Sequence, residues 1–210
     1  MAFVDKTYSV AEQAELYETG QNIVRSAPQL YIGIDVEADG YAGYGSMLAL
    51  AGLSPFGETF YSEIKPITEL HIPRQRAFCE EHGLKRERLL TDAPDVTSVM
   101  RSFNAWVTGL VTVYDKKPVI TAWGADLDSS FIKLYYTLAG LHDEFPFATV
   151  PLDLKSLALS LEPTHDWTKT RKETVPEVLR PGGDFTHFAP DDVKYQQFSH
   201  FVLAALLARE

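Results

Sequence analysis

The chain reads Leu30-Tyr31-Ile32-Gly33-Ile34-Asp35-Val36-Glu37 not far from its N-terminus, and this run is the strongest single indication of its architecture. A short apolar run that follows Pro28 and precedes Gly40 is typical of a strand buried on both faces. Side chains two apart on a strand share a face, so Asp35 and Glu37 project together. Two carboxylates buried on one face are costly unless a cation compensates them. The alternative is that the strand ends here and both acids are solvated.

The segments after this strand predict a sheet covered by helices. Strand candidates at residues 46–53 and 59–64 follow on short turns, which suggests a three-strand antiparallel meander. The apolar period then becomes helical, and helices are expected at 94–115, after Gly124, at 152–161 and at 190–209. Short strands are expected at 119–123 and 147–150. This order predicts an α/β domain with a mixed five-stranded sheet, a meander followed by βα units, flanked by helices.

Composition limits the classes of function. The formal net charge of −10 argues against a protein that coats duplex nucleic acid through a broad basic surface. The only cysteine, Cys79, permits no internal disulfide. No signal peptide or membrane-length apolar run is visible, so a cytoplasmic protein with no membrane association is expected. Residues 1–27 are interpreted as an N-terminal extension with a weak helical pattern, and residues 28–210 as one domain.

Asp128 stands near the start of a predicted helix and invites two interpretations. An acid in a first helical turn stabilises the helix dipole, and Asp126, at the expected N-cap, suits that role better. Asp128 instead shares a helical face with three apolar residues, Phe131, Ile132 and Tyr135. That face should pack toward the sheet, and an acid directed there needs a counter-charge. Asp128 is therefore preferred to Asp126 as a functional residue.

The third group of acids is in His187-Phe188-Ala189-Pro190-Asp191-Asp192. The ordinary interpretation is a helix start, because Pro190 suits the first helical position and acids stabilise the first turn. A histidine just before that helix also suits a general base, since its ordinary pKa lies near neutrality. Four carboxylates and a histidine are what a two-metal phosphodiesterase site needs, provided that the fold brings them together.

These segments resemble, in order, the motifs of the DEDD superfamily of 3′–5′ exonucleases, in its DEDDh (DnaQ-like) branch. The D-x-E motif matches Asp35-Val36-Glu37, the Asp followed by x-x-Phe matches Asp128 to Phe131, and H-x-A-x-x-D matches His187 to Asp192. The chain lacks the Asn that many members have near Gly124 and the Thr that often follows the Glu. These departures bear on which substrate the chain would bind, whereas the residues that would carry out the reaction are all present.

The resemblance implies a ribonuclease-H-like fold and a DEDDh exonuclease domain over residues 28–210. Asp35, Glu37, Asp128 and Asp192 would hold two Mg²⁺ or Mn²⁺ ions, and His187 would be the general base. The substrate would be single-stranded or short RNA or DNA with a free 3′ end, and the products 5′-mononucleotides. The same resemblance leaves a homodimer open and assigns no substrate-binding residue.

Three alternatives remain open. A ribonuclease-H-type metal endonuclease would use similar carboxylates but would cut internally. A catalytically silent exonuclease-like interaction module would keep the fold without turnover. A carboxylate-pair glycosidase would use Asp35 and Glu37 without metal. The basic residues within 74–88 are interpreted as a solvated face more readily than as phosphate contacts, because glutamates are interleaved with them.

Overall fold

The computed structural model describes residues 7–162, 164–171, 174–181 and 187–209. Its centre is a five-stranded sheet with the order β3-β2-β1-β4-β5. The strands are β1 (Gln29–Ala38), β2 (Met47–Leu53), β3 (Thr59–Glu63), β4 (Lys117–Ala122) and β5 (Leu152–Asp153). Strand β1 pairs antiparallel with β2 and parallel with β4, so the predicted mixed sheet, with a meander followed by helix-linked strands, is confirmed.

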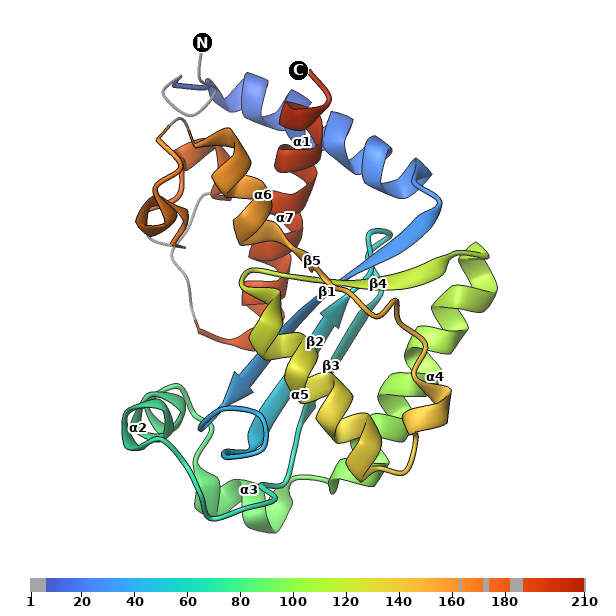
Figure 1. The fold of residues 1–210 in the computed structure, drawn as a ribbon, viewed down its shortest axis with the longest axis vertical. Coiled ribbons are helices and arrows are strands. Elements are labelled where there is room, and N and C mark those ends of the chain that lie inside the picture. Colours follow the sequence, from blue (N-terminus) through green and yellow to red (C-terminus); the bar gives the residue numbers. More distant parts are fainter. Residues whose placement is uncertain (1–6, 163, 172–173, 182–186, 210) are drawn as a thin grey trace.

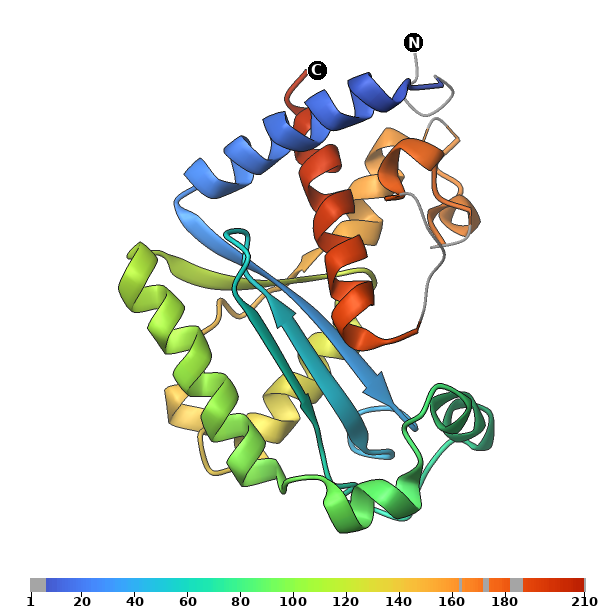
Figure 2. The ribbon, with the colours of Figure 1, turned by 180° about the vertical axis from the view of Figure 1, so that it is seen from behind.

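Helices cover both faces of this sheet. They are α1 (Val10–Ser26), α2 (Pro73–Glu81), α3 (Arg86–Asp92), α4 (Val96–Tyr114), α5 (Ala125–Leu138), α6 (Leu154–Leu161) and α7 (Ala189–Leu207). Helices α4 and α5 pack on one face, whereas α7 crosses the other face with α1 lying across its far end (Figures 1 and 2). Among the described residues, none of these helices has both the length and the apolarity to span a bilayer.

Strand β1 divides its side chains between the two faces. Four alternate residues belong to the large core with α4 and α5: Leu30, Ile32, Ile34 and Val36. On the α7 face, a Cβ on Gly33 would lie 3.2 Å from Val193 Cγ2, and the Tyr31 ring meets the His200 ring at 5.3 Å. The period of two therefore places the two acids of this strand on the α7 face. Glycine at position 33 lets α7 come close to the strand just before the first acid.

Two local predictions are wrong, and two helices were not predicted at all. The strand expected at residues 147–150 is not formed, because Phe147 is buried among the rings of Phe103 and Phe145, and the last strand is the two-residue β5. The N-cap of α5 is Gly124, with φ of 84°, and Asp126 lies exposed in the first turn. Helices α2 and α3 were not expected, because their sequences are mostly polar and bury few side chains.

Helix α1 crosses α7 at Gly20. A Cβ on this residue would lie 1.6 Å from the carbonyl oxygen of Phe201, so the two backbones touch. Leu16 and Val24, one turn to either side, are buried. Helix α1 is thus packed against the C-terminal helix around this crossing. The division of the chain into residues 1–27 and 28–210 stays a prediction.

We expect Gly20→Ala to lower the free energy of unfolding by about 1–3 kcal/mol, because its methyl group must push α1 away from α7. Gly109→Ala is a matched control in the exposed middle of α4, where a Cβ would meet no described atom within 4 Å. That alanine should stabilise the protein by up to about 1 kcal/mol through its better helix propensity. Urea unfolding measures both effects, and equal stability of Gly20→Ala and the parent would contradict this α1–α7 contact.

A second stability prediction concerns pH. Burial lowers the pKa of His200 to about 4, whereas the same residue in the unfolded chain titrates near its ordinary 6.5. As the pH falls, the unfolded state therefore binds a proton on His200 before the folded state does. The free energy of unfolding that neutral, buried His200 contributes above pH 6.5 is lost as the pH falls toward 4. This one residue should account for about 3 kcal/mol of that loss. His200→Phe should show a smaller loss than the parent in urea unfolding between pH 7 and pH 4.5; equal losses would contradict the assignment.

Candidate metal centre

Three carboxylates from β1 and α7 converge at the C-terminal end of β1. One oxygen from each of Asp35, Glu37 and Asp192 lies within 4.8 Å of the other two. Asp35 and Asp192 are buried and Glu37 is half-buried. Like charges gathered with so little water repel one another unless a cation compensates them. Carboxylate oxygens are the hard ligands that Mg²⁺ and Mn²⁺ prefer, so the donor set fits a divalent cation.

Asp128 approaches the same place from the opposite face of the sheet. Strand β1 pairs with β4 only as far as Gly33, so the rest of β1 has an open edge on this side. The Oδ1 of Asp128 accepts a hydrogen bond of 2.9 Å from the backbone N–H of Val36, between the two acids of the strand. Asp128 is buried, as are the three residues on its helical face, but it is not part of the 4.8 Å group.

The start of α7 turns one of its two aspartates inward. Asp192 is 2% exposed, whereas Asp191 has a side chain that is 46% exposed and forms an ion pair of 3.2 Å with Lys194. Ala189 and Val193 pack in a small apolar cluster with two β2 residues, Ala51 and Leu53. This cluster fixes the first turn of α7 on the sheet, and so it determines which aspartate meets the acids of β1.

His187 lies two residues before α7, in the left-handed region with φ of 51°. Its ring packs edge-on against Phe78 of α2, with ring centroids 4.7 Å apart, and against His82 at 5.2 Å. Phe78 and Glu37 both line a pocket between α2 and the end of β1. The imidazole is therefore held at the α2 wall of that pocket.

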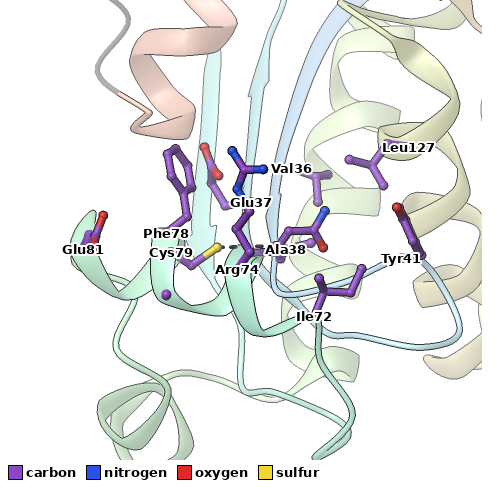
Figure 3. Close-up of a pocket in the computed structure, with 12 residues that line it drawn as sticks. Val36, Glu37, Ala38, Tyr41, Ile72, Arg74, Phe78, Cys79, Glu81 and Leu127 are labelled. Carbon is purple, nitrogen blue, oxygen red and sulfur yellow. Dashed lines mark hydrogen bonds between the residues drawn. The ribbon is translucent and has the colours of Figure 1, made fainter.

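A pocket of about 680 Å³ lies between the end of β1 and α2, beside Glu37. Its volume falls in the range of about 300–1,000 Å³ that small-ligand sites occupy. Figure 3 shows Arg74 extending from α2 toward β1, with Tyr41 and Leu127 on the opposite side. Burial raises the pKa of the Cys79 thiol in this wall to about 12, so the thiol stays protonated and contributes packing.

The sequence did not identify this wall. Helix α2 has a low apolar content, and Arg74 stood in a stretch that was interpreted as a solvated face. The position of Arg74 within the basic stretch was the available signal, but only the fold shows that α2 lies opposite Glu37. The half-exposed ring of Trp167 could stack on a base, but the ammonium of Lys155 covers it at 4.1 Å, which favours a structural role.

No protein-family model matches the sequence. Two curated proteins are similar to part of it: DNA polymerase III of the PolC type from Bacillus cereus, 28% identical over 116 residues, and from Bacillus subtilis, 25% identical over 131 residues. The alignments cover 55% and 59% of this chain but only 8% of each polymerase. The chain therefore corresponds to a small part of those proteins.

Two solved structures share the fold over most of their length. The nuclease domain of 3′hExo, a DEDDh family member solved bound to rAMP, has a TM-score of 0.58 and 14% identity, covering 87% of this chain and 94% of that one. The RNase domain of yeast Pop2 has a TM-score of 0.56 and 11% identity, covering 93% and 84%. The predicted ribonuclease-H-like fold is confirmed, because the chain shares it with both of these nuclease domains.

Proposed function

We propose that this chain is a two-metal-ion 3′–5′ exonuclease that acts on single-stranded or short nucleic acid and releases 5′-mononucleotides. The observation that carries the proposal is the convergence of Asp35, Glu37 and Asp192 within 4.8 Å on a fold shared with nuclease domains. Asp128, bonded to the Val36 amide, completes the set of four acids. Residues 28–210 would form the catalytic domain, with residues 1–27 as an extension whose helix packs on α7.

Each group has a role that its position supports. The four carboxylates would hold two Mg²⁺ or Mn²⁺ ions, which when bound supply an activated water and charge stabilisation for in-line displacement at phosphorus. His187 would accept a proton from the attacking water while Phe78 and His82 hold its ring in place. The pocket beside Glu37 would receive the terminal nucleotide, because it combines aromatic and apolar walls with one cation, Arg74.

A time course on a 5′-labelled single strand tests the reaction class and the polarity together. With Mn²⁺ we expect a ladder that shortens by one nucleotide at a time from the 3′ end, and no cleavage in EDTA. Internal fragments would indicate an endonuclease, and an intact strand would indicate a silent module. A strand with a blocked 3′ end is the matched control, and parallel reactions with RNA, single-stranded DNA and duplex DNA identify the substrate.

His187→Ala should lower kcat by about 10²-fold or more while leaving the free energy of unfolding nearly unchanged, because it removes a general base from a half-exposed position. His142→Ala is the control, since His142 is exposed on a short 3-10 helix after α5. Single-turnover cleavage of the labelled strand measures both variants. Substantial activity in a folded His187→Ala protein would exclude the imidazole from the reaction.

A further inference from the structure

Gln196 of α7 lies buried between Asp35 and the end of β4. Its Nε2 donates a hydrogen bond of 2.5 Å to Asp35 Oδ1, and its Oε1 accepts one of 3.0 Å from the backbone N–H of Trp123. The side chain is 1% exposed. Gln196 follows Asp192 by four residues, so one face of α7 presents both side chains to the site. The amide thus contacts the candidate metal centre without being one of its acids.

The two hydrogen bonds fix the direction of the amide. A backbone N–H only donates, so the Trp123 N–H must face the amide oxygen. The amide nitrogen then faces Asp35, whose ionised carboxylate only accepts. Turning the amide over would lose both bonds at once. The orientation is therefore set by chemistry at each end.

Gln196 also joins the segments that carry the acids. The last β1–β4 pair is Gly33 with Thr121, and β4 ends at Ala122, so the N–H of Trp123 lies beyond the ladder. The Gln196 amide satisfies that N–H. After Trp123 the chain turns at Gly124 into α5, the helix that carries Asp128. One side chain thus ties the Asp35 carboxyl to the backbone that leads to the fourth acid.

We propose that Gln196 is a positioning residue of the metal centre, an inference that rests on the proposed function. Its amide holds the Asp35 carboxyl in the orientation that brings an oxygen within 4.8 Å of Glu37 and Asp192. Hydrogen bonds to an ionised acceptor are among the stronger ones in proteins. Loss of such a partner behind a ligating carboxylate typically weakens metal binding about 10–100-fold.

The test is Mn²⁺ binding to the substrate-free protein, measured by isothermal titration calorimetry. Gln196→Met keeps the length of the side chain and removes both hydrogen bonds, and its Kd for Mn²⁺ should rise about tenfold or more. Gln197→Met is the matched control on the next residue of α7, because Gln197 also donates a hydrogen bond across the fold, to the Ser54 carbonyl, and bonds to no acid among the described residues. Its Kd should match that of the parent.

The outcomes separate this inference from the proposed function. Asp35→Asn should abolish tight Mn²⁺ binding; if it binds Mn²⁺ as the parent does, the metal centre itself is wrong. If Asp35→Asn loses binding but folded Gln196→Met matches the parent, only the role of Gln196 is overturned. Circular dichroism establishes folding. If Gln196→Met does not fold, Gln196→Asn replaces it, because its shorter arm cannot reach both partners, and the same tenfold rise is expected.

Discussion

Asp192→Asn is expected to lower kcat by at least about 10³-fold, whereas Asp191→Asn should leave kcat within about twofold of the parent. The two substitutions are chemically identical and one residue apart on α7. Asp192 is buried with an oxygen within 4.8 Å of Asp35 and Glu37, and Asn at this position has the same shape but no charge to hold a cation. Asp191 is exposed and contacts Lys194 in a surface ion pair, an interaction worth about 0–1 kcal/mol.

Stability measurements give this prediction a second readout. In EDTA, Asp192→Asn should be at least as stable as the parent, because it removes one of three carboxylates that repel one another. Saturating Mn²⁺ should stabilise the parent and Asp191→Asn by about 2–4 kcal/mol and leave Asp192→Asn nearly unchanged. Equal metal-induced stabilisation of the two variants would show that Asp192 holds no ion.

Much of the fold could be predicted because its main helices and strands have recognisable local patterns of apolar residues. The apolar run of β1 and the helical period of α4 and α5 depend on burial, and burial leaves a pattern in the sequence. The preference for Asp128 over Asp126 came from the same pattern, and the structure buries the first and exposes the second. That preference could be made from the positions of the apolar residues within one helix, without any contact between distant segments.

The residues that surround the acids could not be predicted, because each depends on a contact between distant segments. Gln196 is polar and lies 161 residues from Asp35, and no local period marks it. Helix α2 forms a wall of the pocket although it buries only Cys79. Asp39 stands beside Gly40 at the end of β1, yet it is fully buried and pairs with Arg86, 47 residues away. Such pairings are set by tertiary packing, which a single sequence does not display.

That buried pair gives the largest stability effect we expect. Arg86 and Asp39 are 3% and 0% exposed and lie 3.0 Å apart, and Arg86 also donates to the Thr68 carbonyl. Arg86→Met should lower the free energy of unfolding by about 3–5 kcal/mol, because it leaves the Asp39 carboxylate buried without its counter-charge. The backbone oxygen of Asp39 accepts a hydrogen bond from Ile72, at the start of α2. Loosening Asp39 should therefore also disturb the α2 wall of the pocket.

Glu69 offers a matched control, because it pairs with the same Arg86 at 3.3 Å but its side chain is 82% exposed. Glu69→Gln should change the free energy of unfolding by less than about 1 kcal/mol. The double variant Asp39→Asn with Arg86→Met should be more stable than Arg86→Met alone, since no unpaired charge then remains buried. Urea unfolding of the parent, Asp39→Asn, Arg86→Met and the double variant measures the coupling between the two side chains, and Glu69→Gln is measured beside them. If Arg86→Met and Glu69→Gln lower the free energy of unfolding equally, the Asp39–Arg86 pair is solvated, and the end of β1 is held by its other hydrogen bonds, such as the one that Asp39 Oδ1 accepts from the Ser46 N–H.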